Sequence, residues 1–196
     1  MPDLRKRPGR QFRSAPVTFQ TRSDENGPVI AGYFAVFNNP TELWHGCIEQ
    51  IAPGAFSSSL GGDVRALIDH DTRLVIGRTV AGTLSLREDS TGLYGEIKIN
   101  EHDSDAMNLY ARVQRGDVSQ CSFGFDIVAE DYVVSPDGQT CTWTVWDTVL
   151  YEVSVVTFPA YEATSVEARN SAGTDALNTS RLERRKNDLK ERIKNL

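Results

Sequence analysis

Residues 121–134, CSFGFDIVAEDYVV, and residues 140–158, TCTWTVWDTVLYEVSVVTF, are two long β-type runs. Both are rich in β-branched and aromatic residues, which favour strands. The segment between them contains SPDG at residues 135–138, a turn signal. The sequence therefore predicts a long hairpin here, and the other elements are placed around it.

A second hairpin is predicted upstream, where residues 80–89 and 92–100 alternate apolar and polar side chains on either side of a turn signal. Residues 29–38 and 64–70 are further strand candidates. Residues 42–62 form an irregular stretch with a possible short helix near residues 55–60. These short strands and turns predict a mainly β fold with flanking helices (α+β), and a closed or nearly closed antiparallel β-barrel.

The pattern changes to helical spacing in residues 103–117, where apolar residues recur every third position. Asp103 or Ser104 is suited to cap the start of this helix, and Gly116 to end it.

The chain has 196 residues, enough for one domain with tails. We expect a flexible basic lead at residues 1–28, the β-barrel domain at 29–168, a flexible linker at 169–180 and a basic C-terminal helix at 181–196. The two basic ends carry net charges of +5 (residues 1–22) and +4 (residues 181–196), and the whole chain carries −6, so the middle carries −15. An acidic body with basic ends is not typical of a DNA-binding domain.

Neither a membrane span nor a secretory signal is expected, because no apolar run is long enough. The three cysteines, Cys47, Cys121 and Cys141, include no CxxC pair, so a disulfide scaffold and a zinc cluster are both disfavoured and a reducing cytosol is expected. Cys121 and Ser122 should face opposite sides of a strand, and Cys121 is interpreted as a small buried apolar residue.

The three histidines, His45, His70 and His102, show no metal-binding spacing, and no phosphate-binding, dinucleotide or GxSxG motif is present. A serine hydrolase needs a nucleophile beside a histidine base. His70 and Ser122 each lie beside a predicted strand and are the attractive pair, although spacing alone leaves plain structural roles open for both.

Several blocks in one order add to this pattern: GYFAVFN (32–38), EQIAPGAF (49–56), ALIDHD (66–71), IGRTVAGTLSLRED (76–89), SQCSFGF (119–125) and LYEVSVVTFPAYEAT (150–164). They resemble the HK97-type prohead maturation protease family of tailed phages and prophages. The resemblance covers about residues 29–168. It implies a serine endopeptidase with a herpesvirus-protease-like β-barrel, related to the assemblins.

The resemblance also implies roles for individual residues. His70 matches the family's catalytic histidine and general base, and Ser122 matches the nucleophile. Glu152 falls where an acidic residue completes the triad by orienting the histidine, whereas His102 is the alternative third member because herpesvirus relatives use a second histidine. Gly124 either lets the backbone approach substrate or marks a strand bulge.

The implied partners are the major capsid protein and its scaffold region, with a homodimer possible and neither a membrane nor nucleic acid required. The implied location is the host cytoplasm, inside the assembling procapsid, and no cofactor or metal is implied. Self-cleavage in residues 170–180 is a further expectation. Three alternatives stay open: a catalytically inactive barrel acting as a scaffold or assembly chaperone, a metal-assisted hydrolase using the three histidines, and a nucleic-acid binder using the basic ends.

Overall fold

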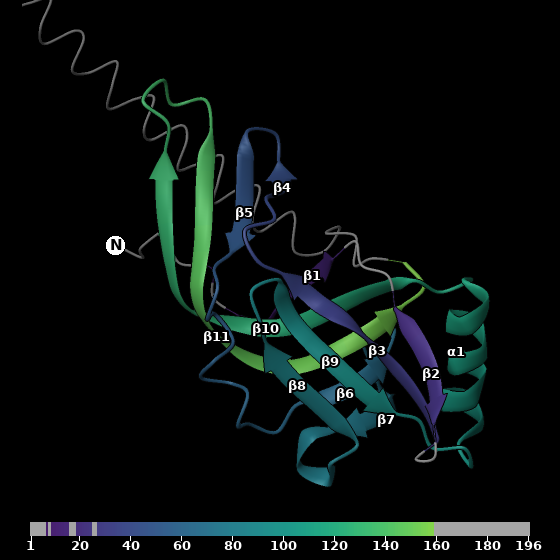
Figure 1. Ribbon diagram of the computed structural model, residues 1–196. Coiled ribbons are helices and arrows are strands. Elements are labelled where there is room, and N and C mark those ends of the chain that lie inside the picture. Colours follow the sequence, from purple (N-terminus) through teal and green to yellow (C-terminus); the bar gives the residue numbers. More distant parts are fainter. Residues whose placement is uncertain (1–6, 8, 16–18, 25–26, 159–196) are drawn as a thin grey trace, which may run out of the picture.

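Two β-sheets and one α-helix make up the part of the chain that the structure, a computed structural model, describes: residues 7, 9–15, 19–24 and 27–158 (Figure 1). The larger sheet has the strand order β1 (Gln11–Ala15), β10 (Gln120–Val134), β11 (Cys141–Val156), β5 (Cys47–Ile51), β4 (Thr41–Trp44), and β11 also pairs with β6 (Arg65–Ile68), which pairs with β7 (Asp71–Arg78). The smaller sheet has the order β2 (Gln20–Asp24), β3 (Gly27–Val36), β9 (Gly92–Lys98), β8 (Leu84–Glu88).

Both predicted hairpins are confirmed. β10 and β11 pair antiparallel along almost their whole length around the turn that begins at Ser135. β8 and β9 pair antiparallel around a turn in which the Asp89 carboxylate accepts hydrogen bonds from the backbone N–H groups of Thr91 and Gly92. An aspartate that bonds the backbone two residues on stabilises such a turn, which is why this signal is readable from sequence.

The predicted helix is confirmed as α1 (Ser104–Arg115). Asp103 caps it, since its side chain accepts from the N–H groups of Asp105 and Ala106. Gly116 ends it in the left-handed conformation at φ 86°, which glycine adopts without steric cost. The buried residues of α1 recur at helical spacing and join the main core: Ala106, Leu109, Tyr110 and Val113.

The prediction of a closed or nearly closed antiparallel barrel needs correction. Among the described strands, no pairing joins the two edges of either sheet. The larger sheet is also mixed, because β11 pairs in parallel with both β5 and β6. Parallel neighbours require long connections, and strand periodicity carries no information about which distant segments pair.

The core lies between the two sheets, and alternation along β10 decides which side chains enter it. Cys121, Phe123 and Phe125 are buried in the main core cluster together with residues of the smaller sheet such as Phe34 and Ile97. The prediction for Cys121 is therefore confirmed. Since successive side chains on a strand point to opposite faces, Ser122 and Gly124 lie on the outer face of the larger sheet.

Residues 42–60 also differ from expectation. β4 and β5 occupy part of the stretch that the sequence presented as irregular. The suggested short helix near residues 55–60 is a series of turns, in which Ala55, Ser57 and Ser59 each donate a backbone hydrogen bond to the carbonyl three residues earlier. Figure 1 shows β4 and β5 beside the parts of β10 and β11 that lie toward their connecting turn, at the end of the molecule away from α1.

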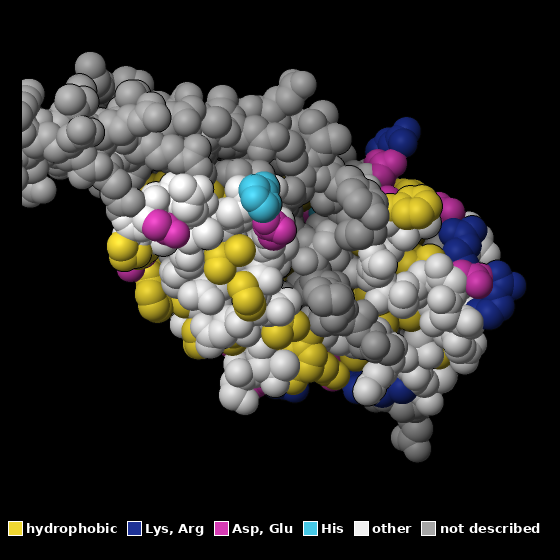
Figure 2. Space-filling model, turned by 90° about the horizontal axis from the view of Figure 1, so that it is seen from above, with side chains coloured by type: hydrophobic (Ala, Val, Ile, Leu, Met, Phe, Trp, Pro, Cys, Tyr) yellow, Lys and Arg dark blue, Asp and Glu magenta, His cyan; other side chains and the backbone are white. Residues whose placement is uncertain are grey.

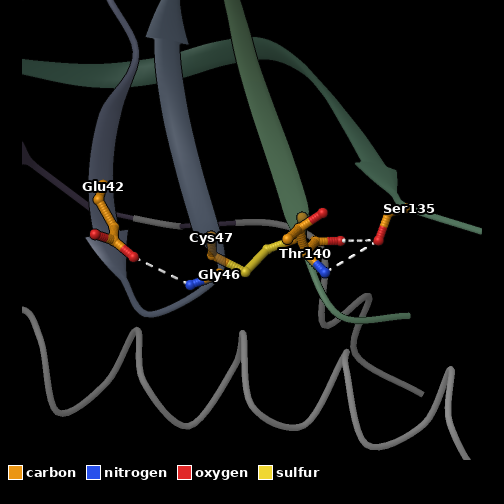
Figure 3. Close-up of a disulfide and its surroundings, with 6 residues drawn as sticks. Glu42, Gly46, Cys47, Ser135 and Thr140 are labelled. Atoms are coloured by element: carbon orange, nitrogen blue, oxygen red, sulfur yellow. Dashed lines mark hydrogen bonds between the residues drawn. A yellow bond between two sulfur atoms is a disulfide. The ribbon is translucent and has the colours of Figure 1, made fainter. Parts of the chain in front are cut away.

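A disulfide joins Cys47 and Cys141 (Figure 3), although the cysteine pattern disfavours a disulfide scaffold and a reducing cytosol is expected. The two residues are direct partners in the parallel pairing of β5 and β11, with Cα atoms 4.5 Å apart. Gly46, at φ 80°, precedes the bond, and a Cβ there would lie 2.7 Å from the Gln139 carbonyl oxygen. The bridge fastens the far end of the long hairpin to β5.

The N-terminal region contributes two strands, β1 and β2, although residues 1–28 are predicted to be a flexible lead. β1 pairs with β10, and β2 pairs with β3. The folded part therefore begins before residue 29. The predicted linker at 169–180 and helix at 181–196 lie outside the described residues.

Surface charge is uneven on the face seen from above. Figure 2 shows Lys and Arg side chains concentrated toward the end where α1 lies in Figure 1. Arg112 and Arg115 occupy the last turn of α1, where positive charge interacts favourably with the helix dipole.

In the part of the chain described here, no helix has the length and apolar character needed to cross a bilayer.

Candidate active site

The sheet pairings bring three predicted site residues to one region of the outer face. Ser122 in β10 lies directly opposite Ser154 in β11, and Gly124 lies opposite Glu152. Directly opposed residues on antiparallel strands share a face, so these four positions form a compact square. β6 pairs with the same part of β11 and leads into the turn that carries His70.

His70 occupies a two-residue turn between β6 and β7. Asp69 and His70 both have left-handed backbone conformations, with φ values of 48° and 61°. Such a conformation costs a residue other than glycine about 1–2 kcal/mol. The turn is held by Asp69, whose N–H donates to the Val155 carbonyl at 3.0 Å and whose carboxylate accepts from the Thr157 N–H at 2.7 Å.

Glu152 binds His70 directly. The Nδ1 atom of His70 lies 2.7 Å from Oε1 of Glu152, and the side chain of Glu152 is 6% exposed. The second carboxylate oxygen, Oε2, accepts a 2.5 Å hydrogen bond from the Ser154 hydroxyl. With both oxygens engaged, the carboxylate has a fixed orientation and selects the tautomer in which Nδ1 carries the proton.

One polar atom each of His70 and Ser122 has no hydrogen-bond partner. Neither Nε2 of His70 nor Oγ of Ser122 has a hydrogen-bond partner, although both atoms are buried. Buried polar groups without partners are rare in native structures, so each one calls for an explanation. Acyl transfer requires a serine hydroxyl within hydrogen-bond reach of the base nitrogen. The structure brings Ser122 and His70 to one region, but the two side chains do not hydrogen-bond to each other.

The geometry of the site explains why residue 124 is a glycine. A Cβ at Gly124 would lie 2.5 Å from Glu152 Oε1, and the strand register shifts between Gly124 and Phe125. The residue that this register shift leaves unpaired, Tyr151, lies on β11 rather than on β10. The missing side chain of Gly124 makes room for the carboxylate. Sequence reasoning did not single out Ser154, because a serine on a strand carries no signal until its opposite neighbour is known.

The other histidines lie elsewhere in the fold. His45 is exposed in the turn between β4 and β5, with Nδ1 3.9 Å from Glu42, and His102 is exposed just before α1. Among the described residues, neither of these side chains forms a hydrogen bond or an ion pair with His70. Glu152, rather than His102, is thus the neighbour of His70.

The two aspartates that flank His70 are engaged by other residues. Asp71 next to His70 binds Arg73, and this hydrogen bond holds the pKa of Asp71 down at about 2. Asp69 binds Thr157. Within the described ranges there is no group of three or more His, Cys, Asp or Glu side chains placed to hold a metal ion.

Comparison with known proteins identifies the family. Residues 17–178 match the family described as Caudovirus prohead serine protease. The chain belongs to this family. The match includes both sheets' central strands and every residue of the candidate site.

Two individual proteins are similar to the chain. The prohead protease of Enterobacteria phage HK97 is 34% identical over 159 residues, which are 78% of this chain and 64% of that protein, so the match spans less than two thirds of the relative's length. The bacteriophage T4 capsid assembly protease is a structural neighbour with a TM-score of 0.41 and 9% identity, covering 74% of this chain and 98% of that one.

Proposed function

We propose that the protein is a serine endopeptidase that matures a phage procapsid by cleaving the scaffold region of the major capsid protein and itself. Membership of the prohead serine protease family supports peptide hydrolysis. The single observation that carries the site assignment is the 2.7 Å contact between His70 Nδ1 and Glu152, with a free Nε2 on the other side of the ring.

The proposed chemistry is acyl transfer. His70 Nε2 takes the proton of Ser122 Oγ as the oxygen attacks the peptide carbonyl, and the imidazolium then protonates the leaving amine. Glu152 holds the tautomer and stabilises the imidazolium. Water hydrolyses the acyl-enzyme by the same route, and backbone N–H groups bind the oxyanion.

The proposed partner is the major capsid protein, with the enzyme acting inside the assembling procapsid in the host cytoplasm. A homodimer remains part of the proposal. The HK97 relative is named a prohead protease, and this name supports a role in the capsid.

One observation favours the alternative of a catalytically inactive protein that acts as a scaffold or assembly chaperone. Ser122 is 0% exposed, so a peptide reaches its hydroxyl only after neighbouring atoms move. A scaffold role requires no such movement.

The test is intact mass over time for the wild type, Ser122→Ala and Ser85→Ala, each alone and with the capsid protein encoded beside it. Ser85 is exposed on β8 and serves as the matched control. We expect cleavage with the wild type and the control, and a loss of at least about a thousandfold in rate for Ser122→Ala. Cleavage that is equal in all three would exclude Ser122 as nucleophile, and no cleavage in any would favour the scaffold alternative.

A further inference from the structure

The N-terminal strand β1 lies against the candidate site. It pairs antiparallel with β10, with Ser14 opposite Ser122 and Phe12 opposite Gly124. Directly opposed residues share a face, so Phe12 and Ser14 extend the outer face that carries the site. The sequence places β1 in a predicted flexible lead, but in the structure β1 borders the proposed nucleophile.

Phe12 contacts the histidine itself. Its ring meets the His70 ring in a T-shaped arrangement, with ring centroids 4.7 Å apart and an interplanar angle of 70°. Such aromatic contacts contribute about 0.5–1.5 kcal/mol beyond the burial of their area, and they favour one orientation of the ring.

Gly124 leaves space for this contact. A Cβ there would lie 3.0 Å from Cε1 of Phe12 and 2.5 Å from Oε1 of Glu152. The phenyl ring and the carboxylate thus both lie over Gly124, and both contact His70. The imidazole is held at Nδ1 by a hydrogen bond and at its ring by an aromatic neighbour.

β1 is anchored by buried charges. Nη2 of Arg13 lies 2.8 Å from Glu49 Oε2, and Arg7 binds both Glu49 and Glu130. The guanidinium of Arg7 also lies 4.3 Å from the centre of the Trp143 ring. Arg7, Arg13 and Glu49 are all buried, so this attachment is part of the interior and keeps Phe12 in place.

We propose that Phe12 is a positioning residue of the active site, which holds the His70 ring so that Nε2 faces Ser122 while Nδ1 stays on Glu152. The inference rests on the proposed function of Ser122 and His70. It makes β1 an integral part of the enzyme, so removing β1 abolishes activity.

The test measures the rate at which a small fluorophosphonate modifies Ser122, a reaction that needs the activated serine but no peptide recognition. Phe12→Leu and Phe12→Met keep an apolar side chain but remove the ring, whereas Phe12→Tyr keeps an aromatic ring. We expect the labelling rate to fall about 10- to 100-fold in Phe12→Leu and Phe12→Met, because a misplaced base slows the reaction. The rate should stay near that of the wild type in Phe12→Tyr.

The matched control is Tyr94→Leu, which removes one ring of another T-shaped pair, Tyr33 with Tyr94, in the smaller sheet. It should leave the labelling rate unchanged. Thermal unfolding establishes that each variant is folded. In a Ser122→Ala background, the far-downfield proton NMR signal of the His70 Nδ1–H group should broaden or shift in Phe12→Leu and stay in place in Tyr94→Leu.

The outcomes separate the two proposals. If the wild type is not labelled at all, the proposed function fails. If the wild type is labelled and folded Phe12→Leu and Phe12→Met are labelled equally fast, with the His70 signal unchanged, the positioning role of Phe12 is overturned.

Discussion

At the scale of single residues, the candidate site consists of a carboxylate with both oxygens engaged and a histidine with one nitrogen free. Glu152 accepts from His70 on one oxygen and from Ser154 on the other. Under the proposed function, Glu152 orients the histidine and His70 transfers the proton. The predictions at this scale concern the contacts of Glu152.

Replacing Glu152 with glutamine should lower kcat by about 10³–10⁴-fold, because the amide removes the negative charge and allows the wrong histidine tautomer. The cleavage rate of the capsid protein measures the effect. His102→Gln is the control, since His102 is the other proposed third member and lies exposed before α1. A large loss in His102→Gln with little loss in Glu152→Gln would reverse the assignment.

Replacing Gly124 with alanine should reduce both activity and stability. The new Cβ would lie 2.5 Å from Glu152 Oε1 and would displace the carboxylate from His70. We expect at least about a tenfold loss of rate, with the unfolding free energy lowered by about 1–3 kcal/mol. Gly61→Ala is the control, because no atom lies within 4 Å of the added Cβ. Equal activity of the two variants would contradict the packing role of Gly124.

At the scale of elements, attachment of the N-terminal strand depends on Glu49 in β5. Burial alone would raise the pKa of Glu49, but Arg13 and Arg7 hold it down to about 2. An acid whose pKa is lower in the folded state adds stability above its unfolded pKa, about 4.5, and this stability is lost as the pH falls toward 2. Burial raises the pKa of the neighbouring Glu130, and this acts in the opposite direction above pH 4.5.

Glu49→Gln should therefore destabilise the fold by about 3–5 kcal/mol at pH 7, since it leaves Arg13 buried without a counter-charge and Arg7 with Glu130 alone. Urea unfolding between pH 2 and pH 7 measures this. The difference from the wild type should shrink as the pH falls below 4.5. Asp63→Asn, which breaks an exposed ion pair with Arg78, should show no measurable change. If the difference in unfolding free energy between Glu49→Gln and the wild type does not change with pH, the charge of Glu49 is not what stabilises the fold.

Local elements could be predicted from sequence, and distant pairings could not. The two hairpins and α1 have their turn and cap residues within a few positions, so Asp89, Asp103 and Gly116 signal them directly. β1 lacks such a signal, because Arg13 resembles a solvated residue until its partner Glu49, 36 positions away, is known. The parallel pairings of β11 with β5 and β6 likewise depend on packing between distant segments.

The candidate site shows the same division. His70 and Ser122 could be proposed from local sequence blocks, and Glu152 from the family resemblance. Ser154 and Phe12 could not, because their importance comes from the residues opposite them in the sheet. A one-residue change of register would place either side chain on the other face.

At the scale of the whole molecule, the Cys47–Cys141 bridge connects β5 to the far end of β11 across 94 positions of sequence. Denatured protein alkylated without reduction should gain one adduct, on Cys121, and after reduction it should gain three. Reduction should also lower the unfolding free energy by about 2–4 kcal/mol. Mass spectrometry counts the adducts, and three adducts without reduction would show that the bond does not form.

The central claim is that His70 and Glu152 activate Ser122. The most direct measurement is the site and stoichiometry of fluorophosphonate modification of the full chain, mapped by peptide mass spectrometry, for the wild type and for Glu152→Gln. We predict one adduct per chain on Ser122 in the wild type and labelling slowed by at least about a hundredfold in Glu152→Gln. An adduct on a different residue, or equal labelling of both proteins at Ser122, would contradict the claim.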